Sequence, residues 1–267
     1  MSYSRIKSFA KINLALNVIS KSHSMHKIES IISFLNLHDQ ILIKKIKDKN
    51  HKIIFTGLFK RNIKKKNTIS NLLLILEKQK ILKNYKFKII IKKNIPTGAG
   101  FGGGSMNAAC ILKFLMKRGF VNIKKKEIIK LTSLIGSDVI LGMYSKSLVL
   151  KSNKAIKELS IKNFYQTLIV KPNFGCSTKQ IYSGVKNIYR PKFNHPIKKM
   201  FNLNFLKKAK NDLEIVAFDK YPKLYNLKIF LEKLPKVEFV RMTGSGSAII
   251  AYFMSKKYCH DAEKKVK

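Results

Sequence analysis

Five of the chain's 13 glycines lie between residues 98 and 104, directly before an apolar run at residues 108–115. Glycine adopts positive φ angles and lets other atoms approach the backbone closely. The apolar run predicts a buried helix, with Ser105 or Asn107 as its N-cap. A glycine loop that leads into a helix N-terminus directs N–H groups and the positive end of the helix dipole to one point. The segment therefore predicts a loop that binds phosphate.

The loop differs from the two most familiar phosphate-binding sequences. No Gly-Lys-Ser/Thr closes it, as a P-loop requires, and no acidic residue stands at the distance expected for a dinucleotide-binding fingerprint. A tight turn without a ligand is the alternative. The segment has no Asn-Gly or Asp-Gly pair of the kind that marks a hairpin, which makes this alternative weaker.

Two charged residues interrupt apolar sequence and are the best candidates for catalysis. Asp138 stands in LIGSDVILGMY, and Lys11 interrupts the apolar segment FAKINLAL. If they face each other beside a loop that holds a triphosphate, the carboxylate would accept a hydroxyl proton and the ammonium would stabilise the developing alkoxide. That is the chemistry of a kinase acting on a small alcohol. The alternatives are a helix-cap or turn aspartate and an exposed lysine on a strand face.

The charge of the chain is strongly positive, at +41 from 55 basic and 14 acidic residues. Such an excess normally suggests a nucleic-acid partner. Only five of the 55 basic residues are arginines, and the lysines are spread over the whole chain. Arginine is the residue that forms bidentate contacts with phosphate and guanine. We therefore attribute the charge to drift in an AT-rich genome and expect no specific nucleic-acid partner.

The composition otherwise indicates an ordinary globular protein of 267 residues with 45% hydrophobic residues. No apolar run approaches the length of a membrane span, and the first residues do not resemble a signal peptide. We expect a cytoplasmic protein without a membrane partner. The three cysteines are far apart in the sequence, which predicts buried free thiols rather than a disulfide framework or a zinc site.

Hydrophobic periodicity predicts the elements that position these residues. Strands are expected at residues 10–20, 26–37, 39–46, 51–57, 85–91 and 147–152. Helices are expected at residues 67–82, after the glycine loop, and from residue 122 to a Gly-Ser-Asp turn at 136–138. Further strand and helix patterns follow in residues 164–185 and 237–253. A change of rhythm predicts two domains, residues 1–158 and 159–267.

Several motifs of the chain resemble those of a known family. PTGAGFGGGSMNAA resembles the Pro-x-x-x-Gly-Leu-Gly-Gly-Gly-Ser-Ser-Asn-Ala-Ala signature of the GHMP kinases. Further segments, in order, are similar to the branch of that superfamily that phosphorylates diphosphocytidyl methylerythritol in the non-mevalonate isoprenoid route. They are FAKINLALNV, MH at 25 and 26, LIGSDV, STKQIY at 177–182, NDLEIVA at 211–217 and RMTGSGSAI at 241–249. These matches run over most of the chain.

The resemblance implies an α+β, two-domain GHMP kinase fold. Its N-terminal domain would be ribosomal S5 domain 2-like and would bind ATP, and its C-terminal domain would be ferredoxin-like. The implied reaction is ATP-dependent phosphorylation of the 2-hydroxyl of diphosphocytidyl methylerythritol, with ATP and Mg²⁺ as cofactors, by a monomer or weak homodimer. The alternatives are another small-alcohol kinase of the superfamily, of homoserine or mevalonate type, and an RNA-binding protein with an S5-like fold.

The resemblance also assigns roles to single residues. Asp138 would be the base that takes the hydroxyl proton, and Lys11 would be its electrostatic partner. The magnesium ion would be held largely by phosphate oxygens, without a metal site built from protein ligands. ATP would lie along the loop residues Pro96, Thr97, Gly98, Ala99, Gly100, Phe101, Gly102, Gly103, Gly104, Ser105 and Met106. The substrate would contact Asn13, His26, Thr178 and Tyr182.

The chain departs from the family pattern at three places. Ser24, Met25 and His26 stand where the family usually has Gly-Tyr-His, so a thioether replaces the aromatic ring that would face cytosine. Phe101 and Met106 replace a leucine and a serine in the loop. We expect both loop replacements to be tolerated, because backbone groups bind the phosphates.

Overall fold

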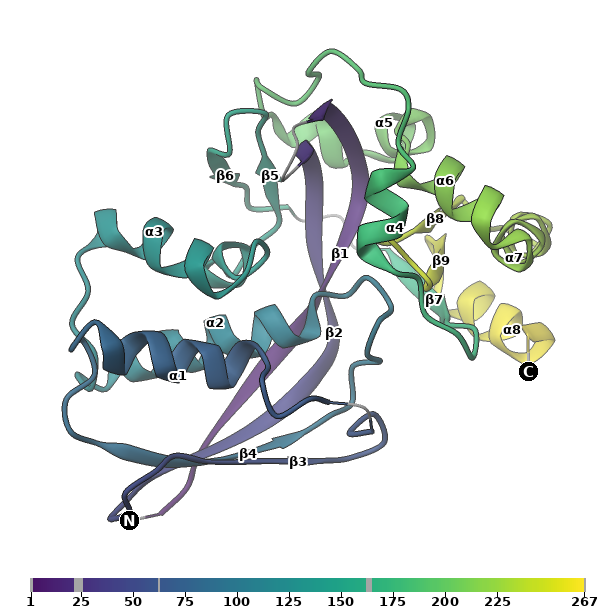
Figure 1. Ribbon diagram of the computed structural model, residues 1–267. Helices are drawn as coiled ribbons and strands as arrows, with labels where there is room; N and C mark the ends of the chain where they lie inside the picture. Colours follow the sequence, from purple (N-terminus) through teal and green to yellow (C-terminus); the bar gives the residue numbers. More distant parts are fainter. Residues whose placement is uncertain (1, 22–25, 62, 162–164, 267) are drawn as a thin grey trace. The chain divides into compact units, whose positions relative to one another are not determined.

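The computed structural model describes residues 2–21, 26–61, 63–161 and 165–266 (Figure 1). The strands are β1 (Ser4–Lys21), β2 (His26–Ile46), β3 (Lys52–Thr56), β4 (Lys86–Lys92), β5 (Leu148–Leu150), β6 (Ile156–Glu158), β7 (Gln166–Val170), β8 (Phe239–Met242) and β9 (Ile249–Phe253). The α-helices are α1 (Thr68–Lys78), α2 (Gly103–Lys117), α3 (Lys125–Ile135), α4 (Thr178–Ser183), α5 (Leu203–Lys208), α6 (Leu213–Lys220), α7 (Pro222–Glu232) and α8 (Lys256–Val266). Two 3-10 helices are η1 (Ile140–Met143) and η2 (Lys198–Phe201).

Contacts divide the chain into two compact units that interleave along the sequence. The first unit comprises Met1–Lys11, Leu35–Pro96 and Gly102–Ser145. The second unit comprises Ile12–Phe34, Thr97–Phe101 and Lys146–Lys267. Strands β1 and β2 thus contribute residues to both units. The domain boundary near residue 158 stays a prediction.

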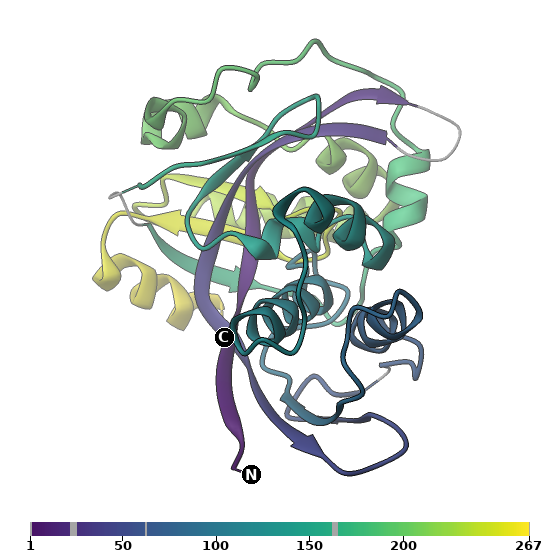
Figure 2. The same ribbon diagram turned by 90° about the vertical axis from the view of Figure 1, so that its left-hand side faces the viewer.

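The first unit packs three helices against strands. Strand β4 pairs in parallel with β3 and antiparallel with β2 from Gln40 to Ile46. Figures 1 and 2 show α1, α2 and α3 gathered together. Every second residue of β4 is buried, as its alternating sequence predicts. The core includes Ile41, Ile43, Leu72, Leu76, Phe87, Ile89, Ile91, Leu112 and Leu115.

Strand β2 differs from the sequence prediction, because residues 26–37 and 39–46 form one continuous strand rather than two. Asp39, the first residue of the second expected strand, is completely buried. Its carboxylate accepts hydrogen bonds from the backbone N–H groups of Asn94 and Ile95, at 2.7 and 2.9 Å. A buried carboxylate with such partners is tolerated inside a strand, so the polar residue does not end it.

The second unit is built around an antiparallel sheet in the order β7-β9-β8. All residues of β8 and β9 are buried, and α7 and α8 pack against the sheet (Figure 1). The core includes Leu213 and Ala217 of α6, Leu224 and Leu231 of α7, Ala262 of α8, and Val240, Ile249 and Ala251 of the sheet. Strand β5 also belongs to this unit and pairs with Ser30–Ile32 of β2.

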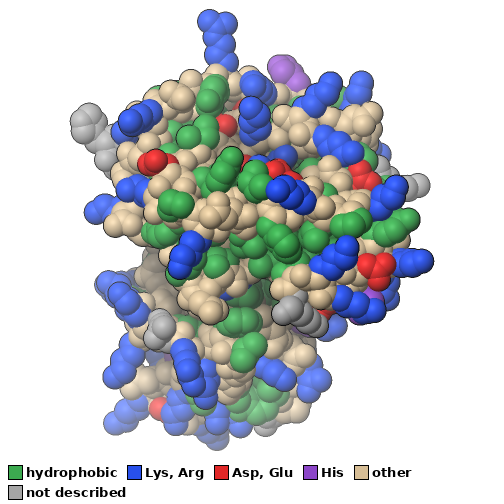
Figure 3. Space-filling view, turned by 90° about the vertical axis from the view of Figure 1, so that its right-hand side faces the viewer, with side chains coloured by type: hydrophobic (Ala, Val, Ile, Leu, Met, Phe, Trp, Pro, Cys, Tyr) green, Lys and Arg blue, Asp and Glu red, His purple; other side chains and the backbone are tan. Residues whose placement is uncertain are grey.

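The mixed helix and strand content confirms the α+β fold class. The three cysteines are free and partly buried. Within the described ranges, no helix has both the length and the apolar character needed to cross a membrane. On the face shown in Figure 3, basic side chains are scattered among hydrophobic and neutral ones rather than gathered into one patch. This scatter agrees with the distribution of lysines in the sequence.

Candidate active site

The glycine loop has the backbone conformation that only glycine adopts easily. Gly98, Gly100 and Gly102 have φ angles of +63°, +83° and +64°. Gly102 is the N-cap of α2, so the helix begins at Gly103. The prediction that Ser105 or Asn107 caps this helix is wrong, because both lie inside its first turns. Since Gly102 has no side chain, the N–H groups at the helix start are not covered by a capping group.

Lys11 and Asp138 meet at this glycine. The ammonium Nζ of Lys11 lies 3.4 Å from Oδ2 of Asp138. A Cβ atom added to Gly102 would lie 3.0 Å from Cε of Lys11 and 3.6 Å from Oδ2 of Asp138. All three residues belong to the first unit. The structure therefore brings together the two charged side chains that the sequence analysis singled out, at the start of α2.

The surroundings of Lys11 and Asp138 bear on the alternatives to a catalytic role. Lys11 is 4% exposed, so the alternative of an exposed lysine on a strand face is wrong. Asp138 lies in the turn before η1, as one alternative expected, but its carboxylate does not cap that helix. The Asp138 side chain keeps 36% of its surface exposed. An accessible carboxylate beside a buried ammonium is suited to accept a proton, with the new charge stabilised nearby.

A second close approach brings α1 to the start of α2. A Cβ atom on Gly104 would lie 2.9 Å from Oγ1 of Thr68, in the first turn of α1. Asn67 caps α1 by accepting hydrogen bonds from the N–H groups of Ile69 and Ser70. A side chain at position 104 has no room unless Thr68 moves. Two helix N-termini therefore lie close to each other beside the loop.

The expected substrate residues of the second unit are held by short polar contacts. Asn13 is buried; its N–H donates to Oγ1 of Thr243 at 3.1 Å, and its Nδ2 donates to Oγ of Ser30 at 2.8 Å. The hydroxyl groups of Thr178 and Ser245 are 2.9 Å apart. These contacts fix two polar side chains at the glycine turn that follows β8.

His26 and Tyr182 form a pair in the second unit. Their ring centroids are 5.3 Å apart. Burial and the positive charge of Lys21 lower the pKa of His26. Its Nε2 is buried and has no hydrogen-bond partner among the described residues. The pair thus combines an aromatic face with an imidazole nitrogen. Ser24 and Met25, which depart from the family pattern, lie outside the described residues.

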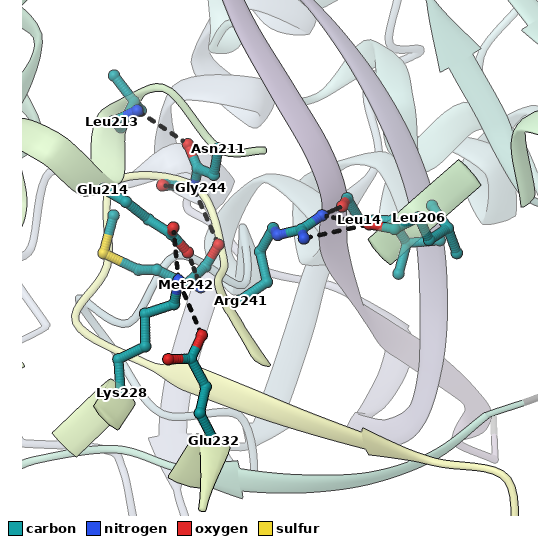
Figure 4. A network of polar contacts seen from close by, with 10 residues as sticks. All are labelled: Leu14, Leu206, Asn211, Leu213, Glu214, Lys228, Glu232, Arg241, Met242 and Gly244. Atoms are coloured by element: carbon teal, nitrogen blue, oxygen red, sulfur yellow. Dashed lines mark hydrogen bonds and ion pairs between the residues drawn. The ribbon is translucent and has the colours of Figure 1, made fainter. Parts of the chain in front are cut away.

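Figure 4 shows the polar network that holds the glycine turn that follows β8. Nδ2 of Asn211 donates to the carbonyl groups of Met242 and Gly244, each at 2.8 Å. Oε1 of the buried Glu214 accepts the N–H of Met242 at 2.7 Å. Asn211 and Glu214 belong to the NDLE motif, for which the sequence alone offered no role. The network now supplies one, because it fixes the backbone at the end of β8.

Arg241 extends this network to strand β1. Its guanidinium donates to the carbonyl groups of Leu14 and Leu206, the former at 2.7 Å (Figure 4). Burial lowers the pKa of Arg241, and the nearby Glu214 carboxylate opposes that shift. Since Leu14 directly follows Asn13 in the sequence, Arg241 helps to fix the backbone that carries Asn13.

The described residues contain no group of three or more His, Cys, Asp or Glu side chains arranged to hold a metal ion. Magnesium often keeps several water ligands and binds one or two carboxylates together with substrate phosphates. The carboxylate at the loop is that of Asp138. The residues present therefore fit a magnesium ion carried by a nucleotide.

Comparison with known proteins adds independent information. Residues 67–146 match the family model described as the GHMP kinases N terminal domain. The chain is 52% identical, over 97% of its length and 92% of the relative's, to a protein of Pelagibacter ubique named 4-diphosphocytidyl-2-C-methyl-D-erythritol kinase. The chain belongs to the 4-diphosphocytidyl-2-C-methyl-D-erythritol kinase family. A protein of that name from Thermodesulfovibrio yellowstonii is 32% identical over 98% of this chain and 92% of its own.

Solved structures confirm the fold of this family member. A crystal structure of a 4-(cytidine 5'-diphospho)-2C-methyl-D-erythritol kinase superposes with a TM-score of 0.79, at 22% identity, covering 98% of this chain and 95% of the other. The expected GHMP kinase fold is therefore confirmed, with its two sheets. As a member of this kinase family, the protein is an ATP-dependent phosphotransferase.

Proposed function

We propose that this kinase transfers the γ-phosphoryl group of ATP to the 2-hydroxyl group of 4-diphosphocytidyl-2-C-methyl-D-erythritol, in the non-mevalonate route to isoprenoid precursors. The observation that carries the proposal is the contact between Lys11 and Asp138 at Gly102. The names of the relatives at 52% and 32% identity support the choice of acceptor.

In this mechanism Asp138 accepts the proton of the attacking hydroxyl group. The buried ammonium of Lys11 stabilises the carboxylate and the alkoxide that develops during attack. MgATP, when bound, supplies the phosphoryl group together with the cation that neutralises its charge. Phosphoryl transfer depends mainly on positioning and charge stabilisation, so one base, one cation and a phosphate-binding loop are sufficient.

The loop residues Pro96–Met106 contact the nucleotide in this proposal. Gly102 is central, because it is the N-cap of α2 and lies against Lys11. The backbone N–H groups at the start of α2 donate to phosphate oxygens, and the helix dipole favours their negative charge. The side chains of Phe101 and Met106 are almost completely buried, so they serve packing, and these two residues contact the nucleotide through their backbone.

The cytidine end of the substrate is assigned to the second unit. The ring of Tyr182 offers a face on which cytosine can stack, and Nε2 of His26 faces a polar group of the substrate. Asn13 and Thr178 complete the proposed contacts. The hydrogen bonds of Asn13 with Thr243 and Ser30 support the role of Asn13. The contact between the hydroxyl groups of Thr178 and Ser245 supports that of Thr178.

A cytoplasmic location and a monomer or weak homodimer are part of the same proposal, because the reaction requires the intracellular ATP pool and the proposed catalytic pair comes from a single chain. An RNA-binding role is not favoured. The +41 charge explains weak binding to any polyanion without a specific site.

The choice of acceptor is tested by release of ADP from MgATP in the presence of the cytidylyl substrate, homoserine or mevalonate. We expect turnover of about 1–100 per second with the cytidylyl substrate, the range usual for kinases. The kcat/KM for the other two alcohols should be lower by about 100-fold or more, because their binding leaves polar groups of the site unpaired. A higher kcat/KM for homoserine or mevalonate would assign the protein to another branch of the superfamily.

A further inference from the structure

Asp39 is a fully buried carboxylate that the proposed mechanism does not use. It lies in β2 and belongs, with all of its partners, to the first unit. Oδ1 accepts the backbone N–H groups of Asn94 and Ile95, at 2.7 and 2.9 Å. Oδ2 accepts Nδ2 of Asn107 at 2.9 Å and forms an ion pair with Nζ of Lys93. A single carboxylate thus has four hydrogen-bond donors.

These donors stand on both sides of the glycine loop in the sequence. Lys93, Asn94 and Ile95 directly precede Pro96, at the end of β4, and Asn107 lies in the second turn of α2. The Asp39 carboxylate therefore links residues 93–95, which precede the loop, to helix α2, which follows it. Lys93 also reaches the start of α2, since its Nζ is 3.3 Å from the position of a Cβ atom on Gly103.

Contacts from outside the loop are needed to hold its backbone, because its glycines do not fix their own conformation. Gly98, Gly100 and Gly102 have positive φ angles that glycine adopts without preferring them. The Lys93 ammonium near the positive end of α2 is also unfavourable by itself. The negative charge of Asp39 compensates it, while the hydrogen bonds to Asn94 and Ile95 satisfy buried N–H groups that would otherwise have lost water.

We propose that Asp39 is a positioning residue for the nucleotide: through Asn94, Ile95 and Asn107 it holds the glycine loop in the conformation that binds phosphate. The inference rests on the proposed function only in assigning nucleotide phosphates to this loop. It does not depend on which alcohol accepts the phosphoryl group.

The test is Asp39→Asn, which keeps the shape of the side chain and removes its charge. The amide of asparagine has one oxygen that accepts hydrogen bonds, whereas the Asp39 carboxylate has two. When this oxygen accepts from Asn94 and Ile95, the NH₂ group of the amide faces the donors of Asn107 and Lys93, which lose their acceptor. We expect the Kd of a fluorescent ADP analogue and the KM for ATP to rise about tenfold, as for loss of one hydrogen bond to a charged group. The KM for the acceptor alcohol should change less than about twofold, because Asp39 acts through the loop.

A transposed pair separates positioning from a general loss of stability. Asp39→Asn combined with Asn107→Asp restores one carboxylate and one amide to the cluster, and we expect it to recover most of the nucleotide affinity. The matched control is Glu29→Gln. Glu29 is also fully buried in β2 and accepts the N–H groups of Lys192 and Phe193. Its hydrogen-bond partners lie outside the glycine loop and the residues that flank it, so its change should lower Tm and leave the Kd of the ADP analogue unaltered.

Two results would overturn the inference. One is an Asp39→Asn protein with lowered Tm but an unchanged Kd for the ADP analogue, which would make Asp39 purely structural. If Asp39→Asn does not fold, Asn107→Ala is measured instead, and we expect its Kd for the ADP analogue to rise about threefold. The second result that would overturn the inference is an unchanged Kd for Asn107→Ala. Because the ADP analogue binds without an acceptor, a wild-type enzyme inactive on the cytidylyl substrate would refute the proposed function without affecting this test.

Discussion

Gly102 stands where the glycine loop touches both proposed reacting side chains, so the geometry of Lys11 and Asp138 depends on its lack of a Cβ atom. The sequence alone indicated Lys11 and Asp138, because charged residues are conspicuous inside apolar runs. It did not indicate Asp39. That carboxylate lies between His38 and Gln40 in the sequence, and a short polar run looks the same whether it ends a strand or is buried within one.

Alanine at Gly102 should impair catalysis more than alanine at Gly98. Both positions have φ near +63°, so both changes carry a similar backbone strain of about 1–2 kcal/mol. Only Gly102→Ala also brings a methyl group to 3.0 Å from Cε of Lys11, whereas no atom lies within 4 Å of a Cβ on Gly98. We expect kcat to fall about 100-fold for Gly102→Ala, as small misplacements of reacting groups allow. Equal losses for the two variants, measured by ADP release, would show that Lys11 is not displaced.

At the scale of elements, periodicity predicted most strands and helices, and the structure corrected those whose ends depend on tertiary partners. The alternation in β4 and the helical spacing in α1 report directly which face is buried. The continuity of β2 depends on the donors that Asp39 finds in residues 93–95, which follow β4, and in α2. The start of α2 depends on the φ angle of Gly102. Neither of these is encoded in the local pattern of apolar residues.

His51, directly before β3, contacts both β4 and α1 in the first unit and makes the stability of that unit sensitive to pH. Its Nδ1 accepts the N–H of Phe87 in β4 at 3.0 Å, and its Nε2 lies 3.1 Å from Oε1 of Glu77 in α1. Burial lowers the pKa of His51, against the opposing effect of the Glu77 carboxylate. As the pH falls below about 6.5, the unfolded chain gains a proton that the folded protein resists. The stability contributed by neutral His51 is therefore complete above that pH and is lost below it.

The measurement is the free energy of unfolding by denaturant at pH 7.5 and pH 5.5 for the wild type and His51→Gln. Glutamine keeps an acceptor for Phe87 but does not titrate. We expect the variant to be less stable at pH 7.5 and to lose less stability than the wild type on acidification. Parallel losses in the two proteins would exclude His51 as a source of the pH dependence.

For the molecule as a whole, composition was a poor guide to function and ordered motifs were a good one. A charge of +41 would by itself favour a nucleic-acid partner, but the arginines are few and the lysines scattered. The order of the loop, the Lys11 segment, LIGSDV and NDLE carried the family resemblance, which the 52% identical relative confirms. The way the chain interleaves into two units was not predictable, because contacts far apart in sequence define it.

In the proposed mechanism Asp138, paired with Lys11, takes the proton of the acceptor hydroxyl group. The measurement that checks this role is the kcat of Asp138→Asn on the cytidylyl substrate with MgATP, together with the Kd of an ADP analogue. The control is Asp48→Asn, which removes another carboxylate paired with a lysine, Lys52, in the first unit. We predict a kcat about 10²–10⁴-fold lower for Asp138→Asn with nearly unchanged nucleotide affinity, as loss of a general base requires, and normal turnover for Asp48→Asn. Near-normal turnover by Asp138→Asn would show that Asp138 does not take this proton.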